Sequence, residues 1–381
     1  MRIGVDTRTL NEGKTTGVEV YTSNLIRAML QIDTTNQYVL FSNHFRRVSS
    51  ALPSGARIEV KEFHFPNRLL NLLFALIKWP HIDTLIGGVD VFFSPRFLFG
   101  AWSKKCRLVI TSHDLSFIRA PEFFSWQRRI WHAILSDRKA SKRSDLIIAV
   151  SESTKRDLIR LFQVPESKIR VIYPGLDQDR FVSKKNPGEN RELVRKFELH
   201  RPYILVIATI EPRKNILGVI DAYERLCAMG ERSVDLVIGG GLGWLYRDTI
   251  RRINHSPQRQ GIHFLSTLPE DSKPMLYRNA SIFVFPSLYE GFGFPPLEAM
   301  SCGTPVIAAM NSSLPEVLGD AAVYVNPFDT DQIARAFFDV LRDAKLRLEL
   351  IKRGLVRSKK FTWEQAARQT LQAFEEITHS V

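Results

Sequence analysis

Two glutamates, Glu290 and Glu298, bracket a segment rich in glycine and proline, and their carboxylates could bind hydroxyl groups of a ligand. The segment follows the apolar stretch Ile282–Pro286, which is typical of a buried strand. Pro295 and Pro296 favour the first turn of a helix, because the N–H that proline lacks would have no partner there. The pattern predicts a strand, a tight turn and a helix, with one carboxylate before the turn and one at the start of the helix.

The turn between the glutamates offers backbone N–H groups to an anion. Gly291 and Gly293, on either side of Phe292, allow the backbone to approach a ligand closely. The positive end of the following helix favours an anion at the same place. Hydroxyl groups on both sides of an anion match a nucleoside diphosphate sugar. The alternative is that one glutamate caps the helix and the other faces solvent.

Arg213 and Lys214 are adjacent cations that come after the predicted strand Tyr203–Ala208 and just before a predicted helix. Arginine offers a planar fork to phosphate oxygens, and lysine offers a compact charge. Such a pair can neutralise a departing diphosphate. A surface pair at this position would oppose the helix dipole, so we expect these residues to bind phosphate.

Three further segments carry weaker signals. His113 follows the predicted strand Leu108–Ser112, where its imidazole could exchange a proton, bind a sugar hydroxyl or simply bond to the backbone. Gly17 opens a predicted helix, and its loop either closes on a ligand or only connects two elements. The glycine-rich run Gly239–Gly243 departs from a dinucleotide fingerprint, because Trp244 stands where the helix should begin, so we interpret it as a tight turn near the ligand.

The chain is long for a single core and its charge is unevenly distributed. Its 381 residues favour two domains. Residues 1–200 hold 32 of the 53 Lys and Arg residues but only 20 of the 40 acidic ones. This excess suggests an anionic partner such as nucleic acid, anionic lipid or a phosphate-bearing substrate, although a generally basic composition is an alternative. No apolar run is long enough to span a membrane. Met1–Asp6 is predicted to be a strand and not a signal peptide. The three cysteines have no metal-like spacing and suit a reducing compartment.

Two segments of the basic half could touch a membrane. Leu69–Trp79 is strongly apolar but short, which suits a core helix or an interfacial one. Phe123–Arg143 mixes aromatic and basic residues. It could lie on an anionic membrane, line a channel for a phosphate-linked acceptor, or combine core aromatics with a solvated basic face.

Short apolar strands alternate with helical patterns along the chain, which predicts βαβ units and parallel sheets. The polar stretch 174–188 is rich in turn-forming residues and is interpreted as a linker. We expect one domain at residues 1–182, a second at 183–363, and a C-terminal helix, 364–381, that packs back on the first. The predicted strands are Arg2–Asp6, Tyr38–Ser42, Ile58–Phe63, Val91–Ser94, Leu108–Ser112, Leu146–Ala149, Ile169–Ile172, Tyr203–Ala208, Val234–Ile238, Ile262–Leu265, Ile282–Phe285, Val306–Ala308 and Ala322–Val325.

With these residues in view, the chain resembles the retaining glycosyltransferases of family 4. The most specific match is the Glu-x7-Glu motif of Glu290 and Glu298, and the Gly17 loop is similar to that of O-antigen and other polysaccharide mannosyltransferases. The resemblance implies an α/β fold of the GT-B type, in which two Rossmann-like, doubly wound parallel-sheet domains face each other across a cleft. Other similar segments are Ile210–Asn215, Val150–Thr154 and His113-Asp114.

The resemblance also assigns the residues above to a donor site in the second domain, with the first domain on the acceptor side. It implies no metal and no other cofactor. Where relatives often show a Gly-Ile-Gly run, only Gly17 remains. The implied contacts are Glu290 with the donor sugar, Glu298 with the ribose hydroxyls, Arg213 and Lys214 with the diphosphate, Gly291, Phe292 and Gly293 with sugar and phosphate, and His113 with the reacting sugar.

The function expected from this resemblance is transfer of mannose from GDP-mannose, with retention, to a lipid-linked or polysaccharide acceptor in lipopolysaccharide biosynthesis. The implied location is the cytoplasm, with peripheral contact at the inner face of an anionic cell membrane and no nucleic-acid partner. Two alternatives stay open: a sugar-nucleotide epimerase on the same fold, and a basic module that binds RNA or membrane.

Overall fold

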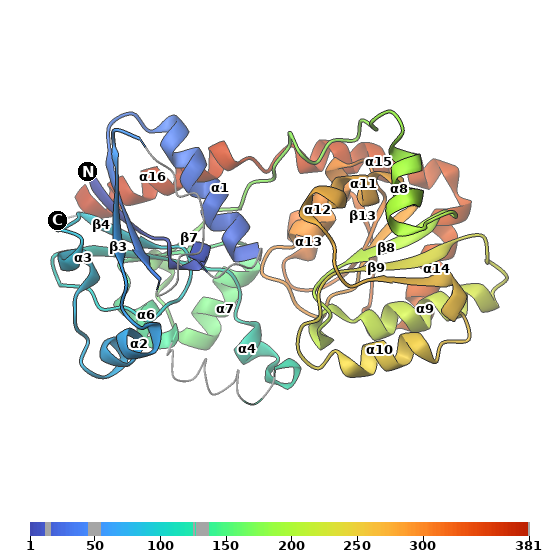
Figure 1. Ribbon diagram of the computed structural model, residues 1–381, viewed down its shortest axis with the longest axis horizontal. Coiled ribbons are helices and arrows are strands. Elements are labelled where there is room, and N and C mark those ends of the chain that lie inside the picture. Colours follow the sequence, from blue (N-terminus) through green and yellow to red (C-terminus); the bar gives the residue numbers. More distant parts are fainter. Residues whose placement is uncertain (12–16, 45–54, 125, 127–136, 380–381) are drawn as a thin grey trace. The chain divides into compact units, whose positions relative to one another are not determined.

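The alternating strands and helices form two doubly wound α/β units in a computed structural model that describes residues 1–11, 17–44, 55–124, 126 and 137–379 (Figure 1). Unit 1 comprises Met1–Arg119, Trp126–Gly175 and Thr362–Val381. Unit 2 comprises Ala120–Ser125 and Leu176–Phe361. The chain therefore passes between the units at Gly175, slightly earlier than the sequence-based boundary after residue 182.

Unit 1 contains a parallel sheet of seven strands in the order β3-β2-β1-β4-β5-β6-β7. Buried aliphatic and aromatic side chains on these strands form its core with residues of the covering helices. The strands are β1 (Arg2–Asp6), β2 (Gln37–Asn43), β3 (Ile58–Phe63), β4 (Val91–Ser94), β5 (Arg107–Ser112), β6 (Leu146–Ala149) and β7 (Ile169–Val171). The helices are α1 (Gly17–Ile32), α2 (Asn67–Leu76), α3 (Ile82–Leu85), α4 (Ser116–Arg119), α6 (Asp137–Arg143), α7 (Glu152–Phe162) and α16 (Trp363–His379), with short 3-10 turns η1 (Arg8–Asn11) and η3 (Glu166–Lys168).

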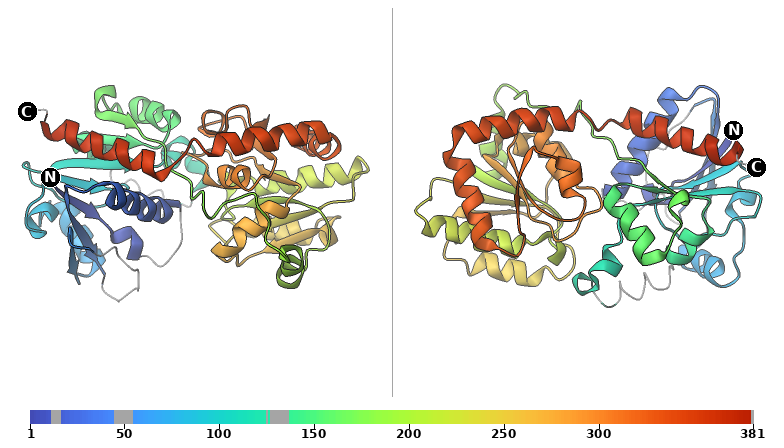
Figure 2. Two further views of the ribbon diagram at one scale, coloured as in Figure 1. Left: turned by 90° about the horizontal axis from the view of Figure 1, so that it is seen from above. Right: turned by 180° about the vertical axis from the view of Figure 1, so that it is seen from behind.

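The last helix, α16, is part of unit 1 although it follows unit 2 in the sequence. It packs alongside α1, and both views of Figure 2 show its C-terminal end close to the N-terminus. Ala367 and Phe374 on its inner face are fully buried, and the Phe374 ring lies 5.4 Å from that of Phe93 on β4. The sequence predicts this helix over 364–381, and the structure has it at Trp363–His379.

Unit 2 contains a parallel sheet of six strands in the order β10-β9-β8-β11-β12-β13, with helices on both faces (Figure 1). The α9 and α14 helices pack together over one face, and α12 and α15 pack together as well. The strands are β8 (Tyr203–Ile207), β9 (Asp235–Gly239), β10 (Ile262–Leu265), β11 (Ile282–Phe285), β12 (Val306–Ala309) and β13 (Ala322–Val325). The helices are α8 (Glu189–Phe197), α9 (Ile216–Ala228), α10 (Arg247–Asn254), α11 (Lys273–Asn279), α12 (Phe294–Ser301), α13 (Leu314–Leu318), α14 (Thr330–Arg342) and α15 (Ala344–Ser358), with 3-10 turns η2 (Pro121–Phe123), η4 (Pro212–Lys214), η5 (Arg259–Gly261) and η6 (Glu270–Ser272).

All thirteen predicted strands are present among the described residues, shifted by at most a residue at their ends. One feature was not anticipated: the short segment Ala120–Ser125 belongs to unit 2, although the chain before and after it belongs to unit 1. It is held by Trp244, whose indole N–H donates to the Phe123 carbonyl and whose ring stacks on Phe124 at 5.4 Å. Residues 125 and 127–136 of the predicted basic aromatic segment lie outside the described residues, and its last part, Asp137–Arg143, forms α6 of unit 1.

The glycine-rich run after β9 bends at Gly240 and then pairs with the backbone following β8. Gly240 has a φ of +140°, and a Cβ there would lie 2.0 Å from the Ala208 carbonyl oxygen. Gly241 accepts a hydrogen bond from the Ile210 N–H, so the run supports the segment that leads into Arg213. The sequence predicts a tight turn at these glycines, and the structure instead has a bend at Gly240 followed by a parallel bridge between Leu242 and Ile210.

Gly240→Ala should destabilise the protein by roughly 2 kcal/mol or more, because the methyl group collides with backbone and the φ angle is unfavourable for alanine. Gly241→Ala is the matched control, because a Cβ at Gly241 would have no neighbour within 4 Å. Urea unfolding measures both variants. Equal midpoints for the two variants would contradict this account of the bend.

Candidate functional site

The candidate site lies at the carboxyl ends of β8 and β11, which are neighbouring strands in the unit 2 sheet. The strand order reverses between these two strands, and such a switch point is where doubly wound sheets bind ligands. Arg213 and Lys214 lie in η4 after β8, and Glu290 lies in the turn after β11. The topology therefore brings together two segments that are far apart in the sequence.

The predicted cations contact the first predicted glutamate directly. The Lys214 ammonium lies 2.5 Å from Oε1 of Glu290, and Arg213 Nη1 lies 3.0 Å from its Oε2. Arg213 Nη1 also donates to the Tyr289 carbonyl at 2.6 Å. The Ser287 hydroxyl donates to Oε1 of Glu290 at 2.6 Å. Both carboxylate oxygens of Glu290 are therefore occupied by donors.

A second carboxylate, Glu211, completes the cluster. Arg213 donates from Nη2 and Nε to Oε1 of Glu211 at 2.7 and 3.1 Å. Glu211 and Glu290 are buried, and the side chains of Arg213 and Lys214 are only 12% exposed. Two carboxylates and two cations thus form a nearly dry cluster that is neutral when both carboxylates are ionised.

The pKa values of the two buried carboxylates shift in opposite directions. Burial opposes ionisation of Glu290, but the charges of Arg213 and Lys214 and the hydrogen bonds to its oxygens outweigh this and lower its pKa to about 2. Burial raises the pKa of Glu211, and its ion pair with Arg213 compensates only in part. Glu290 is therefore the carboxylate that pairs with both cations in its own ionised form.

Lys214 has unused hydrogen-bonding capacity. Within the part of the chain that the structure describes, Glu290 is its one hydrogen-bond acceptor, which leaves two of three ammonium protons for a ligand. Its ammonium also lies 5.1 Å from the centre of the Phe285 ring, at the end of β11. A cation in this position can bind an incoming anion without leaving its pocket.

The turn from Glu290 to Gly293 is fixed by hydrogen bonds. The Glu290 N–H donates to the Ser312 hydroxyl, and the Ser313 hydroxyl lies 3.0 Å from the carbonyls of Glu290 and Phe292. Gly293 has a φ of +98° and directly precedes α12, which begins at Phe294. The predicted order of strand, tight turn and helix is confirmed.

The start of α12 offers few N–H donors. Pro295 and Pro296 occupy its first turn, as expected from the sequence, and neither carries an N–H. Neutralisation of a bound diphosphate at this site would therefore depend mainly on Arg213 and Lys214. The helix end, which the sequence predicts to favour an anion, would thus contribute less to anion binding than these two side chains.

The second glutamate of the motif, Glu298, does not join the ion cluster. It is the fifth residue of α12, half-buried, and its Oε2 accepts a hydrogen bond from the Tyr277 hydroxyl at 2.8 Å. Burial raises its pKa, although Lys273 and the tyrosine hydrogen bond act against this. Glu298 therefore lies one helical turn beyond the start predicted for it, within the same structural motif.

His113 lies in unit 1 at the end of β5. Its Nε2 is 2.8 Å from the Pro95 carbonyl, and because a carbonyl only accepts, Nε2 carries the proton and Nδ1 is an acceptor in the neutral ring. Burial lowers the pKa of His113 to about 4, which keeps the ring neutral at physiological pH. The edge of the Tyr21 side chain packs against it at 4.8 Å. The His113 ring thus bonds to the backbone through Nε2 and presents Nδ1 as an acceptor nitrogen.

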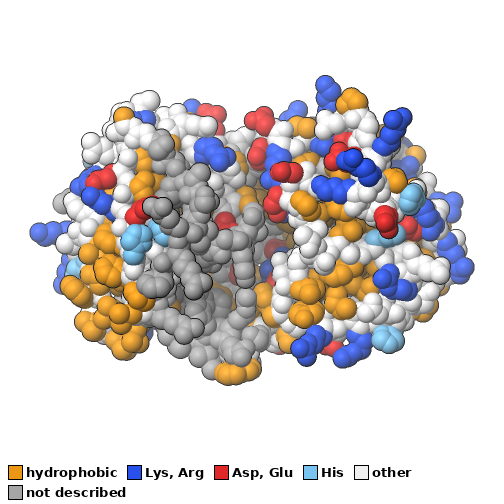
Figure 3. All heavy atoms as spheres, in the orientation of Figure 1, with side chains coloured by type: hydrophobic (Ala, Val, Ile, Leu, Met, Phe, Trp, Pro, Cys, Tyr) orange, Lys and Arg blue, Asp and Glu red, His pale blue; other side chains and the backbone are white. Residues whose placement is uncertain are grey.

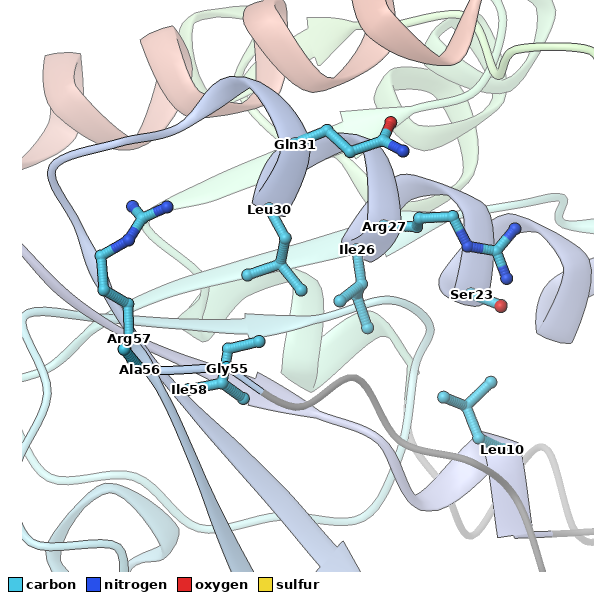
Figure 4. Close-up of a pocket in the computed structure, with 10 residues that line it drawn as sticks. All are labelled: Leu10, Ser23, Ile26, Arg27, Leu30, Gln31, Gly55, Ala56, Arg57 and Ile58. Atoms are coloured by element: carbon cyan, nitrogen blue, oxygen red, sulfur yellow. The ribbon is translucent and has the colours of Figure 1, made fainter.

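Gly17 is the first residue of α1 and is exposed, and residues 12–16 of its predicted loop lie outside the described residues. A separate cavity of about 420 Å³ lies beside α1 in unit 1 (Figure 4). Leu10, Ile26, Leu30 and Arg57 are among the residues that line it. None of the predicted site residues lines this cavity.

Sequence reasoning did not identify Glu211, Ser287 or Tyr277 as part of the site. Glu211 could have been found, because it is two residues from Arg213 and an acidic residue at that spacing can bond a guanidinium at a turn. Tyr277 gave no signal, since its contact with Glu298 depends on how α11 packs on α12. The contact of Ser287 with Glu290 depends on the local conformation of the loop after β11.

Two family models match this chain. Residues 15–180 match the model described as Glycosyltransferase Family 4, and residues 190–357 match that described as Glycosyl transferases group 1. O-antigen chain mannosyltransferase B of Escherichia coli is 36% identical over 71% of this chain and 70% of its own length. The chain belongs to glycosyltransferase family 4. The Glu-x7-Glu motif and the cation pair are thus parts of a glycosyltransferase.

A second relative is also named a mannosyltransferase, and solved structures are similar in fold. The serotype-specific mannosyltransferase WbdA of Escherichia coli is 30% identical over 72% of this glycosyltransferase, which spans only 34% of WbdA. Sucrose-phosphate synthase from Thermosynechococcus elongatus has a TM-score of 0.78 at 18% identity, over 100% of both chains. Anabaena HepE in complex with UDP-glucose has a TM-score of 0.72 at 19% identity, over 99% of this chain and 100% of its own. The expected GT-B fold, with two Rossmann-like parallel-sheet domains, is confirmed.

Glu290→Gln should destabilise this glycosyltransferase by roughly 3 kcal/mol, because it leaves the buried Lys214 without its charged partner and Arg213 with Glu211 alone. Inorganic pyrophosphate should restore much of this loss by binding the cations, and so raise the Tm of the variant more than that of the native protein. The measurement is thermal unfolding with increasing pyrophosphate.

Glu189→Gln is the matched control for this prediction. Glu189 is equally buried in unit 2, and Arg278 Nε donates to it at 2.9 Å. This variant should also be destabilised but should gain no more from pyrophosphate than the native protein does. If pyrophosphate stabilises both variants equally, Arg213 and Lys214 are not a phosphate site.

Proposed function

We propose that this glycosyltransferase transfers mannose from GDP-mannose, with retention at the anomeric carbon, to a lipid-linked or polysaccharide acceptor. The names of the relatives support the sugar, since both curated relatives described above are mannosyltransferases and one acts on O-antigen chains. Capture of a nucleotide sugar has a parallel in HepE, whose structure contains UDP-glucose.

The observation that carries the proposal is the cluster of Arg213, Lys214 and Glu290 at the switch point of the unit 2 sheet. The donor diphosphate accepts hydrogen bonds from the unused Lys214 protons and from the Arg213 guanidinium. Negative charge on the diphosphate grows as the bond to the sugar breaks. Two cations held in a nearly dry pocket stabilise that charge more than solvent would.

The sugar and the ribose of the donor are assigned to residues of the Glu-x7-Glu motif. Glu290 accepts hydrogen bonds from hydroxyls of the donor sugar, and Glu298 from those of the ribose. The backbone of Gly291, Phe292 and Gly293 contacts the sugar and the phosphate. The fixed geometry of this turn supports the assignment, because Ser312 and Ser313 hold it in place before any ligand arrives.

The chemical step exchanges one bond for another at the anomeric carbon. The acceptor oxygen forms its bond to this carbon on the face from which the diphosphate oxygen departs, and the departing oxygen takes the acceptor proton. The diphosphate leaves with the electron pair of the broken bond, and Arg213 and Lys214 hold it. Glu290 is already bonded to both cations and has a low pKa, so it is poorly suited to act as a base.

Unit 1 is assigned to the acceptor, with His113 as a contact of the reacting sugar through Nδ1. The assignment is supported by the neutral ring and its acceptor nitrogen. Closure of the Gly17 loop, independence from metal ions, and peripheral attachment to the inner face of the cell membrane remain predictions from the family resemblance. The relatives described here give no support to an epimerase or to an RNA-binding module.

Arg213→Ala and Lys214→Ala should each lower kcat by about 100-fold or more, as does removal of a group that stabilises the departing charge. Arg252→Ala, which removes ion pairs to Asp221 and Glu224 in the same unit, should leave kcat unchanged. The measurement is steady-state transfer to an O-antigen-type acceptor. Turnover near that of the native protein in either active-site variant would exclude the proposed role.

The donor is tested by thermal unfolding with a panel of nucleotide sugars. GDP-mannose should raise the Tm more than UDP-glucose or GDP alone, because a ligand that binds only the folded state stabilises it in proportion to its affinity. A larger shift with another nucleotide sugar would replace GDP-mannose as the donor and leave the rest of the mechanism intact.

A further inference from the structure

Helix α2 has two apolar faces, and only one of them is buried. Leu70 and Phe74 point into the unit 1 core and are each 3% exposed. Leu69, Leu72 and Leu76 lie on the other side of the helix, at spacings of three and four residues. Such spacing forms a continuous stripe on a helix surface. The prediction of a core helix thus holds for one face of α2, and the other apolar face is exposed.

The outer stripe continues past the end of the helix into Ile77 and Trp79. Leu69, Leu72, Leu76, Ile77 and Trp79, here called the α2 patch, are each between 54% and 73% exposed. Figure 3 shows hydrophobic side chains gathered over the part of unit 1 where Figure 1 places α2. Single exposed apolar residues are common, but five on one short segment mark an interaction surface.

The segment that carries the α2 patch has charged residues of one sign only, although Glu62 and Asp83 flank it. From Phe63 to Ile82 the sequence contains Arg68 and Lys78 and no aspartate or glutamate. Lys78 is exposed beside Trp79. An apolar stripe that ends in tryptophan and lysine is the pattern of segments that lie in the interface of an anionic bilayer.

The length of α2 decides between lying on a membrane and crossing it. Its ten residues extend about 15 Å, half the thickness of the hydrocarbon core. In the described ranges, no helix is both long and apolar enough to cross a bilayer. The segment can therefore insert its outer stripe to the depth of the headgroups while Leu70 and Phe74 stay in the unit 1 core.

We propose that the α2 patch docks this protein on the surface of an anionic bilayer, with the leucines and Trp79 inserted and Lys78 at the headgroups. The proposal goes beyond the transfer reaction and does not depend on the identity of the donor. It places the attachment on α2, independently of the basic aromatic segment at 123–143.

Flotation of the full-length protein with vesicles tests the proposal. One set of vesicles contains equal parts of phosphatidylcholine and phosphatidylglycerol, and the other contains phosphatidylcholine alone. The native protein should float with the mixed vesicles and much less with the neutral ones. Leu72→Glu combined with Leu76→Glu should reduce binding at least about tenfold, because two apolar insertions are lost and two negative charges are added.

The matched control is Met310→Glu combined with Phe328→Glu, at two exposed apolar positions of unit 2. It should float like the native protein. Trp79→Ala is a second variant of the patch, with weaker binding expected, in case the double leucine variant folds poorly.

Three results would overturn the proposal. The native protein could stay unbound, the leucine variant could bind as the native protein does, or both vesicle types could bind equally. Sedimentation of the same samples adds a further decisive outcome. If the native protein sediments as a dimer and the leucine variant as a monomer, the α2 patch binds a second copy of the chain and not a membrane.

Discussion

The ion pair between Lys214 and Glu290 joins the loops after β8 and β11 at the point where the strand order of the unit 2 sheet reverses. Charged groups this deeply buried are stable only with partners, because desolvation costs several kcal/mol per ion. Glu290 and Glu211 supply those partners to Arg213 and Lys214 in a pocket that is nearly dry. The candidate site depends on this arrangement.

The same pairing explains how a cation site can exist before its ligand binds. Glu290 holds Lys214 through one of three ammonium protons and orients the others. A diphosphate that enters meets donors already in place, so little reorganisation is needed, and preorganisation of this kind accounts for much of electrostatic catalysis. The two prolines at the start of α12 remove backbone donors, which makes the side-chain cations more important.

Much of this architecture could be predicted from sequence, because parallel strands buried on both faces leave continuous apolar runs. The cations and Glu290 could be placed together since both follow such runs. The tyrosine that holds Glu298 was missed, because this contact depends on packing between α11 and α12. Glu211 was missed although its contact with Arg213 is local. Sequence also could not decide the environment of α2, since apolar residues on two faces look alike until one face is covered.

A structure of the protein with a bound nucleoside diphosphate tests the central claim most directly. The account predicts phosphate oxygens about 3 Å from the Lys214 ammonium and the Arg213 guanidinium, as for charge-assisted hydrogen bonds. Glu290 should remain within reach of both cations beneath the ligand. A diphosphate bound elsewhere in unit 2, with Lys214 still bonded to Glu290 alone, would contradict the account.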